Sequence, residues 1–179
     1  MKILKTNFKG LFIINCFDNC DPRGSFTEIY RKSLIDKNML DYEVNFCQLN
    51  IVKSRKMVFR GLHFQKPPHE QSKLVSVLKG KILDIAVDIR PKSKTYGKYF
   101  SIEISDDDNK SLFIPKGFAH GYLTLTDDVI ISYSVDQYYN KKSEDGISFK
   151  DKKLNIEFGF DKNQLVLSNK DLKLKDFNW

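Results

Sequence analysis

Short runs of β-branched and aromatic residues recur along most of the chain, and several of them alternate between apolar and polar positions. These runs cover residues 45–52, 73–78, 82–89, 99–104, 111–114, 122–125 and 129–135. Alternation with a period of two is typical of strands that bury one face, and clusters of glycine, aspartate and asparagine separate the runs. The pattern predicts an all-β chain.

The spacing of the runs indicates the architecture. Lys79-Gly80 and residues 106–109 are expected to form hairpin turns, and Ser33 is expected to cap a short helix over residues 33–40. Many short strands at regular spacing favour a sandwich or a barrel, and the jelly roll is one of the usual solutions. We therefore expect a jelly-roll barrel with short peripheral helices. The polar stretch after Asp161 is expected to pack outside it.

Nothing in the pattern divides the chain. No repeat, low-complexity segment or linker interrupts the 179 residues, so the sequence predicts one domain over residues 1–179. No apolar run approaches the roughly 20 residues of a membrane-spanning helix, and the N-terminal residues lack the features of a signal peptide. Cys16, Cys20 and Cys47 are expected to be reduced thiols. Together these features predict a cytoplasmic protein with no membrane partner.

The net charge of +7 comes from lysines scattered among acidic residues. The absence of a dense basic run argues against a nucleic-acid partner and suits a small anionic substrate. Arginine is rare, and because its guanidinium group forms paired hydrogen bonds with phosphates and carboxylates, its positions are informative. The arginines are Arg23, Arg31, Arg55, Arg60 and Arg90.

Histidine is scarcer still, and one histidine ends a recognisable motif. His120 closes the segment Pro115-Lys116-Gly117-Phe118-Ala119-His120. The spacing P-x-G-x-x-H is the second signature of cupin barrels, in which the turn directs the histidine into the barrel. His63 lies in the motif Arg60-Gly61-Leu62-His63, where either a catalytic or a structural histidine is compatible with the local sequence.

The first cupin signature has lost its metal ligands. Counting back from Gly80 places Lys73 where metal-binding cupins have a glutamate, and Pro67 and His69 where they have two histidines. Neither proline nor a protonated lysine offers a lone pair to a metal. The sequence predicts a barrel without a metal or another cofactor. Lys73 brings a positive charge into the cavity, where it can stabilise an oxyanion.

A series of motifs follows in order along nearly the whole chain. They are Asp21-Pro22-Arg23-Gly24-Ser25-Phe26-Thr27-Glu28, Gln48-Leu49-Asn50, Arg60-Gly61-Leu62-His63-Phe64-Gln65, Gln71-Ser72-Lys73-Leu74-Val75, Asp84-Ile85-Ala86-Val87-Asp88-Ile89-Arg90, Thr95-Tyr96-Gly97, residues 114–121, and Tyr138-Tyr139 with Glu144. This ordered set resembles the dTDP-4-dehydrorhamnose 3,5-epimerase family of metal-free cupins.

The resemblance implies a reaction on a nucleotide-linked 4-keto-6-deoxy sugar, in which carbon 3, carbon 5 or both are inverted for surface-polysaccharide synthesis. The ketone acidifies the neighbouring C–H groups, so that a base leaves an enolate and an acid returns a proton to the opposite face. His63 matches the base, and an imidazole ordinarily has a pKa of about 6.5, which suits this task. Asp171 matches the carboxylate that orients it, with Asp84 as the alternative partner. Tyr133 matches the acid, the alternative being a packing tyrosine, and Lys73 would hold the enolate oxygen.

Further charged residues match positions that bind substrate. Arg23, Arg60 and Lys170 are suited to the diphosphate or the sugar oxygens. Arg60 or His120 would also help Lys73 to hold the enolate oxygen.

Neutral and acidic residues match positions that recognise the nucleoside. Gln48, Asn50 and Glu28 are suited to hydrogen-bond hydroxyls or base edges. Tyr139 is expected to stack on the nucleobase, and Glu144 to accept a hydrogen bond from a base N–H.

The resemblance also implies a homodimer. In the family the N-terminal block crosses the dimer interface, so Arg23, Phe26 and Glu28 are expected to serve the neighbour's site.

Several positions depart from the family pattern. Met57 stands at a usual glycine, Val52 at a usual serine, and Phe158-Gly159 at a usual Trp-Pro, while the stretch 139–141 lacks a usual proline. Met57 and Val52 are expected near the substrate pocket, so both a dTDP-hexose and a GDP-linked heptose remain candidate substrates.

The alternative functions are a metal-dependent cupin oxygenase and a non-catalytic sugar-binding cupin.

Overall fold

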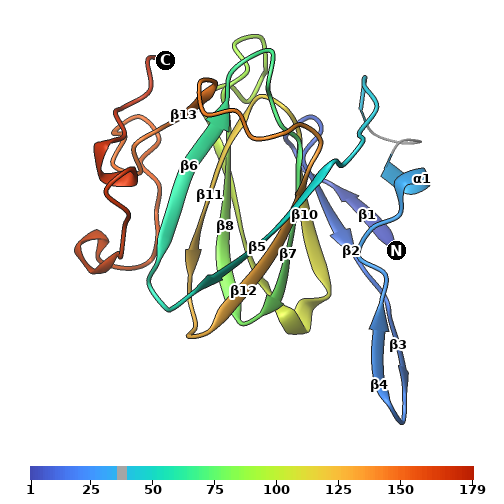
Figure 1. Ribbon diagram of the computed structural model, residues 1–179. Coiled ribbons are helices and arrows are strands. Elements are labelled where there is room, and N and C mark those ends of the chain that lie inside the picture. The colour runs from blue at the N-terminus through green and yellow to red at the C-terminus, as the bar shows by residue number, and fades with distance from the viewer. Residues whose placement is uncertain (36–39) are drawn as a thin grey trace.

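Two antiparallel β-sheets face each other in the computed structural model, which describes residues 1–35 and 40–179 (Figure 1). The first sheet has the strand order β1 (Lys2–Lys5), β2 (Phe12–Asn15), β10 (Lys110–Ile114), β7 (Lys73–Lys79), β12 (Val129–Val135) and β5 (Gln48–Ser54). The second has the order β13 (Glu144–Gly146), β6 (Phe59–Gln65), β11 (Phe118–Thr124), β8 (Lys81–Asp88) and β9 (Tyr99–Ser105). This arrangement confirms the predicted all-β jelly-roll class.

The core lies between the two sheets because alternate residues of each strand point inward. Val75 and Ile131 of the first sheet pack in one buried cluster with Ile82 and Ile104 of the second. Burying an aliphatic side chain of this size stabilises the fold by roughly 1.5–3 kcal/mol. Val75 and Ile131 also line the cavity described below, so this cluster forms part of its wall.

The two predicted hairpin turns are turns, but neither joins a hairpin. Gly80 adopts φ +80° between β7 and β8, and a short 3-10 helix, η1 (Asp106–Asp108), followed by Asn109 at φ 50° joins β9 to β10. In both cases the chain passes from one sheet to the other, because β7 pairs with β10 and β12 whereas β8 pairs with β11 and β9. The hairpin prediction was therefore wrong. Turn-forming residues such as Gly80 and Asn109 determine where the chain reverses, but they do not determine which strand the next strand pairs with.

The predicted strands begin at residue 45, so β1 to β4 were missed, as was the short β13. β12 has the predicted bounds, whereas β11 begins at Phe118, before the expected start at residue 122, and β6 was missed. Gly61 interrupts the pattern of β6, and a run of buried residues in β11 hides its period. The predicted helix appears as α1 (Lys32–Ile35), but Ser33 lies inside it and is not its cap. Residues 36–39 of that prediction lie outside the described residues.

Two segments lie outside the barrel (Figure 1). The C-terminal residues, with the 3-10 helices η2 (Lys162–Gln164) and η3 (Asp171–Lys173), pack beside β6, as the polar composition predicted. Here Phe59 N donates a 3.1 Å hydrogen bond to Val166 O. At the other side the two-stranded arm of β3 (Asp18–Asp21) and β4 (Gly24–Thr27) projects away from the barrel.

Candidate active site

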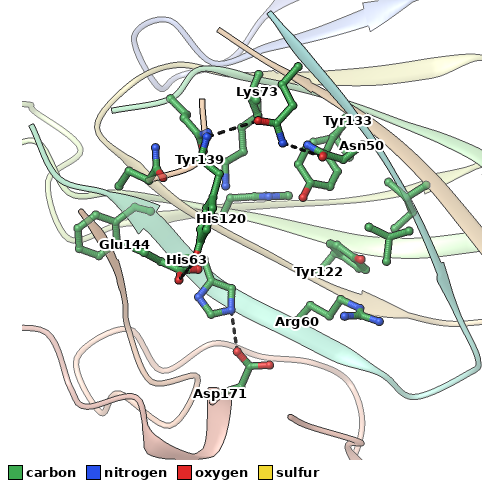
Figure 2. A pocket seen from close by; sticks show the side chains of 18 of the residues that line it. Asn50, Arg60, His63, Lys73, His120, Tyr122, Tyr133, Tyr139, Glu144 and Asp171 are labelled. Carbon is green, nitrogen blue, oxygen red and sulfur yellow. Dashed lines mark hydrogen bonds and ion pairs between the residues drawn. The ribbon is translucent and has the colours of Figure 1, made fainter. Parts of the chain in front are cut away.

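A cavity of about 480 Å³ opens between the two sheets (Figure 2). Most of the predicted site residues line it: Gln48, Asn50, Arg60, His63, Lys73, His120, Tyr133, Tyr139, Glu144, Lys170 and Asp171. Arg23, Phe26 and Glu28 do not line it and lie on or beside the projecting arm.

His63 on β6 faces a carboxylate from the C-terminal segment. His63 Nε2 lies 2.7 Å from Asp171 Oδ1, and the Asp171 side chain is 5% exposed. Ser168 Oγ donates a 2.8 Å hydrogen bond to Asp171 Oδ2. Burial alone would raise the pKa of Asp171, but the hydrogen bonds from His63 and Ser168 outweigh it and hold the pKa below its ordinary value. An ionised Asp171 is thereby fixed against the imidazole.

Asp84, the alternative partner for His63, contacts a different histidine. Its Oδ1 lies 2.5 Å from His120 Nε2, and both side chains are buried. The register of β11 against β8 places His120 opposite Ala86 and Tyr122 opposite Asp84, so these side chains share the inner face. Two separate histidine–aspartate pairs thus lie at the cavity, and in the second of them only His120 lines it.

Lys73 and Tyr133 come from the wall formed by the first sheet. Lys73 pairs with Val135 on β12, so Lys73 and Tyr133 occupy the inner face two positions apart. Burial lowers the pKa of Lys73 to about 8, although the carboxylates of Asp84 and Glu144 oppose the shift. Burial raises the pKa of Tyr133, with Arg60 opposing and Glu144 adding to it. Near neutral pH the lysine is mainly a cation and the tyrosine keeps its proton.

The two walls carry complementary chemistry (Figure 2). His63 comes from the second sheet, whereas Lys73 and Tyr133 come from the first. A proton acceptor on one wall, and a proton donor with a cation beside it on the other, suit removal of a proton from one face of a carbon and its return to the opposite face.

The cavity mouth is held by polar contacts. Tyr139 Oη donates a 2.9 Å hydrogen bond to Glu144 Oε2, and Lys170 forms an ion pair with Glu144 Oε1. Arg60 Nε donates a 3.2 Å hydrogen bond to Ser54 Oγ. Arg60 has no carboxylate ion-pair partner within residues 1–35 and 40–179. Its guanidinium group is therefore available to an anionic ligand.

The sequence reading missed some residues of the lining. Tyr122, Gln65 and Gln71 all contribute to the cavity. Tyr122 follows His120 by two positions on one strand, and this spacing was the available signal. Of the two departures expected near the pocket, Val52 lines the cavity. Met57 does not, and its φ of 62° explains why a glycine suits that position.

Cys16, Cys20 and Cys47 are free thiols. Among the described residues, no group of three or more histidine, cysteine, aspartate or glutamate side chains is placed to hold a metal ion. In the same part of the chain, no helix is long and apolar enough to cross a membrane.

Comparison with known proteins decides the family. The family model described as dTDP-4-dehydrorhamnose 3,5-epimerase matches residues 5–178. The chain belongs to the dTDP-4-dehydrorhamnose 3,5-epimerase family. The family enzyme from Escherichia coli is 38% identical over 97% of this chain and 93% of its own length. Membership confirms the predicted resemblance and makes the chain an epimerase.

Solved structures of family members have the same fold. That of Elizabethkingia anophelis is 39% identical, with a TM-score of 0.94 over 99% of this chain and 96% of its own. The family enzyme of Bacillus anthracis, with TDP and PPi bound, is 37% identical, with a TM-score of 0.91 over 98% of this chain and 99% of its own. An epimerase from Legionella pneumophila in complex with dTDP-4-keto-L-rhamnose is 36% identical, with a TM-score of 0.89 over 98% and 92% of the two chains.

Proposed function

We propose that this epimerase acts on a dTDP-linked 4-keto-6-deoxyhexose and inverts both carbon 3 and carbon 5, supplying a deoxysugar for surface polysaccharides. The observation that carries the proposal is the pairing of His63 with Asp171 across the cavity from Lys73 and Tyr133. The names of the relatives, and the dTDP-4-keto-L-rhamnose complex of the Legionella enzyme, favour a dTDP-hexose over a GDP-linked heptose.

Proton removal is assigned to His63. Its Nε2–H donates to Asp171, so Nδ1, which has no hydrogen-bond partner among the described residues, carries the lone pair. Nδ1 takes the proton from the carbon beside the ketone, and the C–H electron pair moves to form an enolate. The ammonium group of Lys73 stabilises the negative charge that develops on the ketone oxygen.

Proton return is assigned to Tyr133. Its hydroxyl lies on the opposite wall and donates a proton to the carbon as the enolate returns to the ketone. The tyrosinate regains a proton from solvent and the imidazolium loses one, so the cycle is balanced. This return by Tyr133 is assigned to carbon 5. At carbon 3 His63 removes the proton in the same way and solvent returns it, which completes the double inversion.

The remaining cavity residues are assigned to the nucleotide. Arg60 and Lys170 would bind the diphosphate, while Tyr139 stacks on the base and Glu144 accepts a base N–H. His120 is placed to assist Lys73 at the enolate oxygen. Gln48 Nε2 donates a 2.8 Å hydrogen bond to Asn50 Oδ1, and both side chains line the same side of the cavity.

The arm is assigned to a homodimer. The Phe26 side chain is 68% exposed, and on the outer face of β5 Leu49 and Ile51 are also more than half exposed. Exposed apolar groups of this size are typical of interfaces. We propose that Arg23, Phe26 and Glu28 reach the cavity of a second copy. Mixing inactive Arg23→Ala with inactive His63→Ala should restore activity, because a mixed dimer has one intact site; no restoration would contradict this assignment.

The proposed substrate is tested by comparing dTDP- and GDP-linked 4-keto-6-deoxy sugars as substrates, with the products identified by NMR. We expect turnover of the dTDP-hexose with inversion at both carbons. Turnover of the GDP-linked heptose alone, or inversion at one carbon only, would overturn the assignment.

We also propose that the enzyme works in the cytoplasm, which the three free thiols support.

A further inference from the structure

Three glutamine side chains hold the backbone that presents Tyr139. Gln71 Nε2 donates to Gln137 O at 2.7 Å, and Gln48 Oε1 accepts from Tyr139 N at 3.4 Å. Gln65 supplies the third set of contacts. The three come from different parts of the barrel, Gln48 from β5, Gln65 from the end of β6 and Gln71 from the segment before β7. The loop is therefore fixed from three directions.

Among the three glutamines, Gln65 forms the most hydrogen bonds to backbone groups. Its Nε2 donates to His69 O at 2.6 Å and to Tyr138 O at 3.3 Å. Its Oε1 accepts from Asn140 N at 2.6 Å. The residue is 7% exposed, so these contacts are shielded from water. A primary amide is required because the site needs donors and an acceptor from the same side chain.

The contacts of Gln65 bracket Tyr139 in the sequence. They fix the carbonyl group of the residue before it and the N–H group of the residue after it, while the tyrosine ring itself stays 54% exposed at the cavity mouth. The Tyr139 hydroxyl is held separately by Glu144, which pairs with Gln65 across β13 and β6. An exposed aromatic ring on a backbone held by these hydrogen bonds has the form of a preorganised stacking surface.

We propose that Gln65 is a positioning residue that sets the orientation of Tyr139 for the nucleobase. The proposal rests on the proposed function, in which Tyr139 stacks on the base. Gln65 acts through the loop and not through the reacting atoms, so its loss should weaken nucleotide binding and leave the proton-transfer residues in place. The expected signature is a raised KM and a raised Kd for dTDP, with kcat at saturation close to that of the wild type.

Gln65→Glu gives a test within one folded protein. When protonated, a glutamic acid donates one hydrogen bond and accepts another, so it can replace the two 2.6 Å contacts, to His69 O and from Asn140 N; when ionised, it only accepts and repels the two carbonyl groups. We therefore expect dTDP affinity near that of the wild type at pH 5.5 and a loss of about tenfold at pH 8.5, as expected for one buried polar contact. Gln65→Leu, which can do neither, should lose about tenfold at both pH values.

The control is Gln164→Glu, which places the same charge in η2, outside the cavity. The titratable residues near Gln65 include His63, Lys66, His69, Glu144 and Asp145, and all of them are present in the wild type and in this control, so a pH response that does not arise from the new carboxyl group is subtracted. Isothermal titration calorimetry with dTDP gives Kd, and thermal melts at both pH values report folding.

The outcomes separate the two proposals. A pH-dependent loss of dTDP affinity confined to Gln65→Glu supports the positioning role. For Gln65→Glu, wild-type dTDP affinity at both pH values, an equal loss of affinity at both pH values, or a fall in kcat without a change in Kd would overturn it. A wild-type protein that neither binds dTDP nor converts the dTDP-linked 4-keto-6-deoxyhexose would overturn the proposed function itself, and with it the role of Gln65.

Discussion

Asp171 reaches His63 from outside the barrel: its Oδ1 lies 2.7 Å from His63 Nε2, although it belongs to the C-terminal segment and His63 to β6. The segment is held in register by Val166, whose N–H donates to Met57 O at 2.8 Å and whose carbonyl accepts from Phe59 N at 3.1 Å. The geometry of the proposed base therefore depends on how a peripheral segment docks against a strand.

We expect Asp171→Asn to lower kcat by about a hundredfold to ten-thousandfold. The amide can present its NH₂ group to Nε2, which favours the imidazole tautomer with its proton on Nδ1 and removes the lone pair that the mechanism uses. Steady-state kinetics measure the effect, and a thermal melt controls for folding. A kcat within fivefold of the wild type would assign Asp171 to structure.

The pH profile of kcat/KM should fall on the alkaline side with an apparent pKa near 8. Lys73 has its pKa lowered to about 8 by burial, so it is charged below that value and neutral above it. Loss of the charge removes the stabilisation of the enolate, so activity declines as the pH rises. Lys73→Met should cost about a hundredfold to a thousandfold in kcat at neutral pH.

The matching control is the profile of Lys73→Met itself. The residual kcat/KM of this variant should not fall on the alkaline side, because no lysine remains at that position to lose a proton. If kcat/KM of Lys73→Met still fell with an apparent pKa near 8, the titrating group would be another residue.

Tyr122→Phe is expected to stabilise the fold. The Tyr122 hydroxyl is buried, and its oxygen has no hydrogen-bond partner among the described residues. Removing it should raise the free energy of unfolding by about 1 kcal/mol, since a buried polar group without a partner is unfavourable. Tyr42→Phe is the control: the Tyr42 hydroxyl contacts Ser72 Oγ at 2.8 Å and accepts from Lys116 N at 3.1 Å, so its loss should destabilise. Urea unfolding of both variants measures the difference, and a destabilised Tyr122→Phe would contradict the prediction.

Much of the barrel could be read from the sequence, because strands that bury one face reveal their period. β12 is the clearest case, with Val129, Ile131, Tyr133 and Val135 all directed inward. Pairing between strands was not readable, because Gly80 marks a turn without specifying which sheet follows. The same limit applies to β6, where Gly61 breaks the alternation just before His63.

The candidate site was readable to a similar extent. His63 and Lys73 lie in motifs with fixed spacing, so both could be placed from the chain alone. The family resemblance assigned Asp171 to His63, with Asp84 as the alternative. Residue spacing by itself could not decide between them, because the choice depends on the β8–β11 register that gives Asp84 to His120. The buried contacts of Gln65 were equally invisible, since they depend on backbone groups of a distant loop.

Tyr133→Phe should separate the two proton transfers. The substitution keeps the ring packed and removes the proposed acid, while His63 and Lys73 are untouched. We therefore expect the hydrogen at carbon 3 or carbon 5 still to exchange with solvent deuterium, whereas inversion at carbon 5 slows strongly. Parallel NMR measurements of exchange and inversion test this. Inversion at the wild-type rate would show that another group delivers the second proton.

Solvent exchange at carbons 3 and 5 is the most direct test of the central claim that His63 removes these protons. The substrate, dTDP-4-keto-6-deoxyglucose, is incubated in heavy water with the wild-type protein or with His63→Ala, and deuterium at each carbon is followed by NMR. We predict deuterium at both carbons with the wild type and a rate lower by about a hundredfold to ten-thousandfold with His63→Ala, while dTDP binding is retained. Exchange by His63→Ala within a few-fold of the wild-type rate would contradict the account.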